Sequence, residues 1–127
     1  MTTLPVTSVF AGLAALALAF LGLRVAYYRM RARIAYGDQD DRELRRRIRA
    51  HGNFIEYVPL ALIALGLIEI NGAPKWQVWA LGAALAVARI AHAAGLLSGV
   101  MGLRAPGATL TFIVLAVSGL MLLWQAF

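Results

Sequence analysis

Residues 6–23 read VTSVFAGLAALALAFLGL, a run without a single charged side chain. Extended through Tyr28, with one arginine at position 24, the run is long enough as a helix to cross a hydrocarbon layer of about 30 Å. Residues 1–5 carry no basic side chain, which the start of a secretory signal peptide requires, so we expect this helix to be retained. The stretch therefore predicts a first transmembrane helix.

The overall composition fits a membrane protein better than a small soluble domain. The chain has 127 residues, of which 61% are hydrophobic and 14% charged, and a soluble domain of this size cannot bury so much apolar surface. It has no cysteine, so any thiol chemistry must use the sulfur of a ligand. The net charge of +6 comes mainly from arginines between two apolar runs, which indicates membrane topology and not nucleic-acid binding.

Three more apolar runs follow the first. We predict an all-α integral membrane protein of one domain, residues 1–127, with four spans in an up-down-up-down bundle at about 6–33, 42–70, 75–98 and 105–126. Turn-forming residues separate the second and third spans at 71–74 and the third and fourth at 102–107. Asp40 or Asp41 is expected to cap the second helix, and Glu69 to solvate the turn that follows it.

The basic residues predict the orientation of the bundle. Most arginines lie between residues 24 and 49, whereas Lys75 is the basic residue of the turn at the opposite end. The first loop should therefore face the cytoplasm, with both termini outside. The same arginines are expected to attract anionic membrane lipid.

A polar stripe enters the second span. Residues three and four apart share a helix face, which lines up Arg42, Arg45, Arg49, Asn53, Glu56 and Tyr57. Glu56 lies about 10 Å deeper than Arg49, and a carboxylate at that depth needs a partner or a polar cavity. Arg89 and His92 of the third span approach the same half of the bundle. We expect a polar cavity there, lined by Arg49, Asn53, Glu56 and Arg89.

Two interpretations of this cavity stay open. In the first, Glu56 pairs with Arg89 inside the bundle and Asn53 bridges helices, so that the polar residues only fix packing. In the second, the surplus guanidiniums beside one carboxylate bind a small zwitterionic peptide with two carboxylates, because arginine holds carboxylates bidentately. A metal site made of His51, His92 and Glu56 is not expected, since these residues lack ligand spacing.

The run Arg49–Pro59, RAHGNFIEYVP, resembles the signature of the MAPEG family, the membrane-associated proteins of eicosanoid and glutathione metabolism. The resemblance extends to RMR at 29–31, YGD at 36–38, RIAH at 89–92 and RAP at 104–106, and so covers nearly the whole chain. The YGD loop and Gly52 are most similar to the small bacterial inner-membrane branch of the family.

The resemblance implies a homotrimer of four-helix subunits with glutathione bound between neighbouring subunits near the cytoplasmic face. It implies that Arg49 and Asn53 hold carboxylate or backbone groups of glutathione and that Glu56 meets its ammonium group. Arg29 or Arg31 would reach in from the first helix, Arg89 and His92 would line the floor, and Tyr57 is placed to touch the cavity. Only the resemblance names glutathione; no metal cofactor is implied.

Two positions depart from the family pattern. Members that activate the thiol generally have an arginine shortly after the Arg-Ala-Pro turn, where this chain has Ala108, and many have a tyrosine where it has Leu96. A thiolate needs a nearby cation or donor, because the ordinary thiol pKa is about 8.5. The remaining candidates for that catalytic role are Arg104, Thr109, Arg29 and Arg31, and we take Arg104.

We therefore predict a membrane-embedded glutathione-binding protein, a transferase or peroxidase that acts on lipophilic small molecules from the bilayer. The alternative is a glutathione-binding or structural protein without catalysis, which the two departures favour. A small multidrug transporter is a third class. Such exporters carry a carboxylate in their first helix, and this first helix has none.

Overall fold

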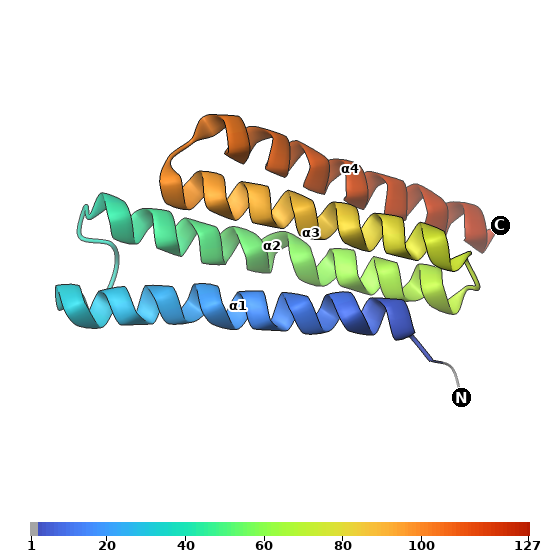
Figure 1. Cartoon of the computed structure of the whole chain (residues 1–127), viewed down its shortest axis with the longest axis horizontal. Helices are drawn as coiled ribbons and strands as arrows, with labels where there is room; N and C mark the ends of the chain where they lie inside the picture. The colour runs from blue at the N-terminus through green and yellow to red at the C-terminus, as the bar shows by residue number, and fades with distance from the viewer. Residues whose placement is uncertain (1–2) are drawn as a thin grey trace.

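The computed structural model describes residues 3–127, which contain four α-helices and no strand (Figure 1). The helices are α1 (Pro5–Ala32), α2 (Arg42–Ile70), α3 (Lys75–Ser98) and α4 (Met101–Ala126). Each of them is long and apolar enough to cross a membrane. The prediction of an all-α protein with four membrane-spanning helices is confirmed.

Local sequence signals explain where three of the helices begin or end. Pro5 occupies the first position of α1, where its missing N–H is not needed. The Asp41 carboxylate caps α2, because its Oδ1 accepts the backbone N–H of Leu44 at 2.8 Å. Gly99 ends α3 with φ at 79°, a left-handed conformation that glycine adopts without steric cost.

The fourth helix begins earlier than the sequence analysis expected. The sequence predicts a turn at residues 102–107, whereas the chain turns at Gly99 and α4 begins at Met101. Pro106 is therefore inside α4, near its start. Its ring removes one backbone hydrogen bond, to the carbonyl of Gly102, and that exposed part of the helix can be solvated.

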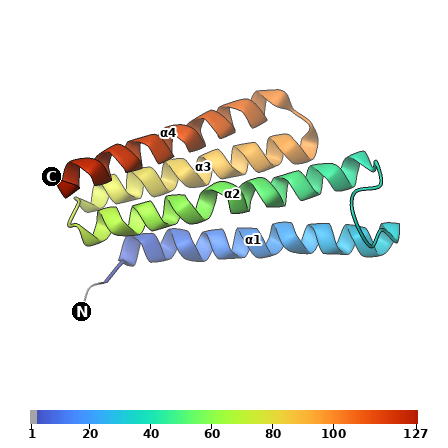
Figure 2. The ribbon, with the colours of Figure 1, turned by 180° about the vertical axis from the view of Figure 1, so that it is seen from behind.

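The four helices are not packed as a closed square. In Figures 1 and 2, α1 and α4 lie on opposite sides of the molecule with α2 and α3 between them. Within residues 3–127, α1 contacts α2 and α3, α4 contacts α3 and α2, and α1 makes no contact with α4. Both ends of the chain and the α2–α3 turn lie at one end of the bundle, and the α1–α2 loop lies at the other (Figure 1).

Glu69 has a different role from the one expected. Its carboxylate accepts the backbone N–H groups of Val6 at 3.0 Å and of Thr7 at 2.8 Å. These N–H groups lie in the first turn of α1 and have no partner within that helix. Glu69 therefore does more than solvate a turn, because it fastens the beginning of α1 to the end of α2.

Two glycines allow α3 and α4 to approach closely at the loop end. A Cβ atom on Gly107 would lie 2.5 Å from the backbone nitrogen of His92, and one on Gly95 would overlap the backbone of Arg104. Neither contact can be relieved by turning a side chain, since the neighbouring atoms belong to the backbone. The close α3–α4 crossing holds the start of α4 beside His92.

Candidate functional site

The polar stripe lies on the outer face of α2. Arg45, Arg49 and Glu56 are all exposed, and the same face continues through the exposed Leu60 and Ile63. Within a single chain, the stripe therefore points away from the other helices. The prediction of a polar cavity inside the bundle is wrong in this respect. Only two of the four predicted lining residues, Asn53 and Arg89, meet inside the bundle.

Arg89 lies inside the bundle and joins three helices. Arg89 is only 5% exposed. One terminal nitrogen of its guanidinium donates to Asn53 Oδ1 at 2.8 Å, and the other donates to Thr111 Oγ1 at 3.3 Å. Thr111 in turn donates to the carbonyl of Gly107 at 2.9 Å. Because the amide oxygen of Asn53 is occupied by Arg89, its NH₂ group remains available as a donor.

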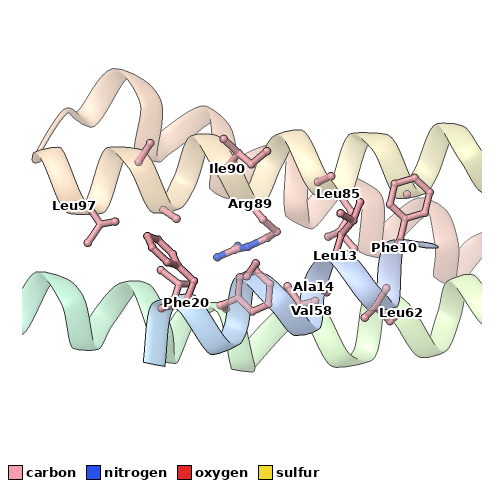
Figure 3. Close-up of a pocket in the computed structure, with 17 residues that line it drawn as sticks. Phe10, Leu13, Ala14, Phe20, Val58, Leu62, Leu85, Arg89, Ile90 and Leu97 are labelled. Atoms are coloured by element: carbon pink, nitrogen blue, oxygen red, sulfur yellow. The ribbon is translucent and has the colours of Figure 1, made fainter. Parts of the chain in front are cut away.

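Arg89 is also the single charged residue of a large apolar groove. The groove has a volume of about 430 Å³ and lies between α1, α2 and α3. In Figure 3 the guanidinium of Arg89 points from α3 into this space, opposite Phe20 and Val58. The other lining residues are aliphatic, aromatic or glycine, so the groove offers room for an apolar molecule.

No ion pair within residues 3–127 neutralises Arg89, Arg49 or Glu56. The expected Glu56–Arg89 pair is therefore not formed in this chain. Arg45, by contrast, leaves the stripe: its guanidinium donates to Asp38 Oδ2 at 2.6 Å and to Asp40 Oδ1 at 2.9 Å. The charged residues of the stripe without an ion pair within residues 3–127 are thus Arg42, Arg49 and Glu56, and Arg89 adds a buried positive charge behind them.

The pairing of Arg45 also fixes the α1–α2 loop. Its hydrogen bond to Asp38 holds the pKa of that carboxyl below its ordinary value. The backbone N–H of Leu44 lowers the pKa of Asp41 in the same way. Both carboxyls therefore carry their charge at neutral pH and order the loop beside the stripe.

His92 and Arg104 meet through the backbone. His92 is buried, and its Nδ1 lies 3.0 Å from the carbonyl oxygen of Arg104. Because a carbonyl oxygen can only accept a hydrogen bond, Nδ1 carries the proton and donates it. The side chain of Arg104 is exposed at the start of α4. His92 thus holds the backbone of the residue expected to stabilise a thiolate, and it does so at the close α3–α4 crossing.

The first-helix arginines and Tyr57 have distinct surroundings. Arg29 donates to the exposed carbonyl of Gly37 at 2.8 Å, whereas Arg31 donates to the hydroxyl of Tyr27 at 3.3 Å. Tyr57 is half-buried, with its ring packed edge-on against Phe112 at a centroid distance of 5.4 Å. Neither first-helix arginine contacts the stripe of its own chain in these hydrogen bonds.

The structure shows the surroundings of Leu96, one of the two positions that depart from the family pattern, and of the two threonines near the start of α4. Leu96 is buried with Leu21, Ala50 and Phe54 in the core, so it does not face the stripe. Thr109, a candidate donor, is exposed, whereas Thr111 is 1% exposed and binds Arg89. Sequence reasoning missed Thr111; its signal was a hydroxyl within a largely apolar span, which Thr109 and Ser118 share.

Comparisons with known proteins give matches over most of the chain. A family model described as the MAPEG family matches residues 7–124. The inner membrane protein YecN of Escherichia coli K12 is 36% identical over 119 residues, which cover 94% of this chain and 91% of that protein. YecN of the O6:H1 strain CFT073 matches with the same identity and coverage.

Proposed function

The chain belongs to the MAPEG family, and from this premise we propose that it binds glutathione on the outer face of α2 and uses it on lipophilic electrophiles, as a transferase or a peroxidase. The relatives are inner membrane proteins, which together with the four spans supports an integral location in that membrane. We assign the α1–α2 loop to the cytoplasm and both termini to the opposite side.

The observation that carries the proposal is the pair of charges at the deeper end of the stripe, Arg49 and Glu56, which no ion pair neutralises. Glu56 and Arg49 are exposed, are seven residues apart and have no ionic partner within residues 3–127. They lie about 10 Å apart along the helix, and Glu56 is at a depth where an unpaired carboxylate is unfavourable. Such a face requires a polar or charged partner, which the apolar acyl chain of a lipid cannot provide.

Glutathione has the charges that this face lacks. Its two carboxylates suit the guanidinium of Arg49 and the NH₂ group of Asn53, and its ammonium group suits Glu56. Arg89 acts in this scheme as a positioning residue, because its hydrogen bond to Asn53 Oδ1 turns the NH₂ group outward. Tyr57 contributes a half-buried ring beside the site.

The partner on the other side of the ligand is a neighbouring copy of the chain, in a homotrimer. The stripe is exposed in a single chain but carries charges at membrane depth. A second copy that covers the stripe would enclose the ligand between the two chains. The family resemblance supplies Arg29 or Arg31 from the first helix of that copy. Both arginines donate a hydrogen bond within their own chain, and we assign the role to Arg29, because Arg31 also stacks over the ring of Tyr27 and lines a cavity of its own chain.

The lipophilic partner reaches the protein from the bilayer. The groove between α1, α2 and α3, with a volume of about 430 Å³ and Arg89 as its charged residue, supports binding of an apolar molecule within the membrane. Arg104 is the cation assigned to stabilise the glutathione thiolate, since its exposed side chain lies at the loop end of α4. In a transferase the thiolate would form a thioether with the electrophile and expel its leaving group. In a peroxidase it would attack a peroxide oxygen and release an alcohol, and a second glutathione would convert the resulting sulfenic acid to the disulfide and water.

A second candidate is a glutathione-binding protein without catalysis. It is favoured by Ala108, which stands where active relatives generally have an arginine, and by Leu96, which is buried in the core. The two candidates differ in one quantity, the pKa of the bound glutathione thiol. Only an enzyme needs to lower it towards neutral pH.

Calorimetric titration of the detergent-solubilised protein with glutathione tests the proposal, followed by ultraviolet absorbance of the thiolate on the same sample. Binding with a thiolate signal near pH 7 supports the enzyme, and binding without it supports the non-catalytic protein. Arg104→Ala should lower the thiolate signal, and an unchanged signal would remove Arg104 from the mechanism. An absence of binding heat would contradict both candidates.

A matched pair of variants tests the stripe. Glu56→Gln should weaken glutathione binding while the oligomer stays intact, because it removes the carboxylate that meets the ammonium group. Glu43→Gln makes the same change on α2, at a residue that pairs with Arg47 away from the stripe, and should leave binding unchanged. Dissociation of the Glu56→Gln oligomer would instead support a role in packing.

A further inference from the structure

A second cavity lies at the loop end of the molecule, outside the polar stripe. It has a volume of about 430 Å³ and is lined by Tyr27, Tyr28, Arg31, Ala32 and Arg47. These residues come from the last turns of α1 and the first turns of α2, which extend beyond the ends of α3 and α4 (Figure 1). The cavity is therefore not covered by the rest of the bundle.

Tyrosine side chains hold the two guanidiniums of this cavity in place. The guanidinium of Arg31 stacks over the ring of Tyr27 at 5.9 Å and donates to its hydroxyl at 3.3 Å. The guanidinium of Arg47 stacks over the ring of Tyr28 at 4.8 Å. Because the stacked arginines are already ordered, a ligand that binds them need not immobilise two long side chains.

The charges of the cavity leave one positive charge without a partner. Glu43 pairs with Arg47 at 2.7 Å, and Asp41 is occupied by the Tyr28 hydroxyl at 3.0 Å and by the cap of α2. Arg31 has no ion pair within the described residues. The lining of the cavity therefore offers the guanidinium of Arg31 without an ion pair, beside the guanidinium of Arg47, which Glu43 neutralises.

The apolar surface of α1 leads directly to this cavity. Leu16, Phe20, Leu23 and Tyr27 are exposed and recur at spacings of three and four residues, so they form one ladder along the helix. The ladder rises about 16 Å, which is close to half of a hydrocarbon layer of about 30 Å. Its length therefore matches the acyl chains of one membrane leaflet.

We propose that this cavity is a binding site for the phosphodiester group of an anionic phospholipid, whose acyl chains lie along the ladder on α1. A phosphodiester carries one negative charge and several acceptor oxygens, which match the unpaired guanidinium of Arg31 and its N–H donors. A free phosphate ion would satisfy the arginines but would leave the ladder unused. The site is separate from the proposed glutathione site, since Arg49 and Glu56 line neither its walls nor the ladder.

Lipid titration followed by native mass spectrometry tests the site on the detergent-solubilised protein. The probes are dioleoyl-phosphatidylglycerol and dioleoyl-phosphatidylcholine, which differ in net charge. Both lipids carry the phosphodiester, but phosphatidylcholine adds a cationic choline group, which the unpaired guanidinium of Arg31 repels. The first phosphatidylglycerol should therefore bind about tenfold more tightly than phosphatidylcholine, a difference of about 1.4 kcal/mol. Arg31→Gln should abolish the preference, and Arg31→Lys should restore part of it, because lysine keeps the charge but not the fork.

Arg33→Gln is the matched control, because it removes the same charge two residues away. Arg33 does not line the cavity, so this variant should keep the preference for phosphatidylglycerol. Equal losses in Arg31→Gln and Arg33→Gln would reduce the effect to general attraction by a basic loop and would overturn the proposal. Inorganic phosphate that binds the protein as tightly as phosphatidylglycerol would overturn it as well, because the acyl chains would then contribute nothing.

Discussion

Replacing Arg89 by methionine separates the two roles that this residue can have. Arg89 is buried, donates two hydrogen bonds to neutral side chains and has no ionic partner within residues 3–127. If it only held the helices together, its loss would unfold the bundle. If it holds Asn53 in position for a ligand, its loss would mainly weaken binding.

The structure allows both effects to be estimated. Two hydrogen bonds from a charged group contribute about 3–6 kcal/mol in total, whereas placing an arginine at the centre of a spanning helix costs about 2.5–3.5 kcal/mol or more. Methionine fills a similar volume without charge. We therefore expect the free energy of unfolding of Arg89→Met to change by less than about 2 kcal/mol, because the two contributions largely offset each other.

Glutathione affinity should change much more than stability. The variant frees Asn53 Oδ1, so that the amide no longer has a fixed orientation. Losing one positioned bond to a carboxylate is worth about 1.5–3 kcal/mol, or a weakening of roughly 10- to 150-fold. Calorimetry with glutathione and thermal unfolding in the same detergent measure the two quantities on one preparation.

Thr111→Val is the control for this experiment. It removes the other acceptor of Arg89 and leaves the bond to Asn53 in place, so its effect on affinity should be small. The reasoning would be refuted if Arg89→Met lost its oligomer or unfolded while Thr111→Val did not, or if its affinity for glutathione equalled that of the wild type.

Further predictions concern the fold. Glu69→Gln should lower the thermal stability, because a charged carboxylate that accepts two backbone N–H groups of α1 is replaced by one amide oxygen; an unchanged melting temperature would contradict this anchor. Gly107→Ala should destabilise the protein by about 1–3 kcal/mol, whereas Gly12→Ala, whose Cβ meets no atom within 4 Å, should not. The pKa of Asp41 is depressed in the folded protein, so its cap is fully formed above the unfolded value of about 3.9 and is lost as the pH falls through the folded pKa. The Asp41 carboxyl resonance should therefore titrate below about pH 3.9, and a higher midpoint would exclude the cap.

Hydropathy was sufficient to predict the spans, because each helix has to match the thickness of a bilayer. Three of the four helices begin within a residue of the predicted positions, and α4 begins at Met101 and not at residue 105. The error arose from reading Gly102 and Pro106 as a turn. The left-handed Gly99 had already reversed the chain, and a proline near the start of a helix is tolerated.

The angular position of the stripe was also predictable, but its environment was not. Helical periodicity places Arg49, Asn53 and Glu56 on one face, yet it does not say which helix covers that face. The bond from Arg89 to Asn53 and the one to Thr111 join residues 36 and 22 positions apart, and such contacts depend on the rotation of whole helices. For the same reason, the sequence could not reveal that Glu69 reaches the first turn of α1.

The most direct test of the glutathione site uses the absence of cysteine from the chain. Gly52→Cys places a single thiol beside Asn53, at a position where a Cβ meets no atom within 4 Å. Its rate of labelling by a maleimide should fall when S-methylglutathione is added, since this thioether binds the site but does not consume the reagent. Ala35→Cys, in the exposed loop, should be labelled at the same rate with and without it. Equal labelling rates at residue 52 in the presence and absence of S-methylglutathione would contradict a glutathione site on this face of α2.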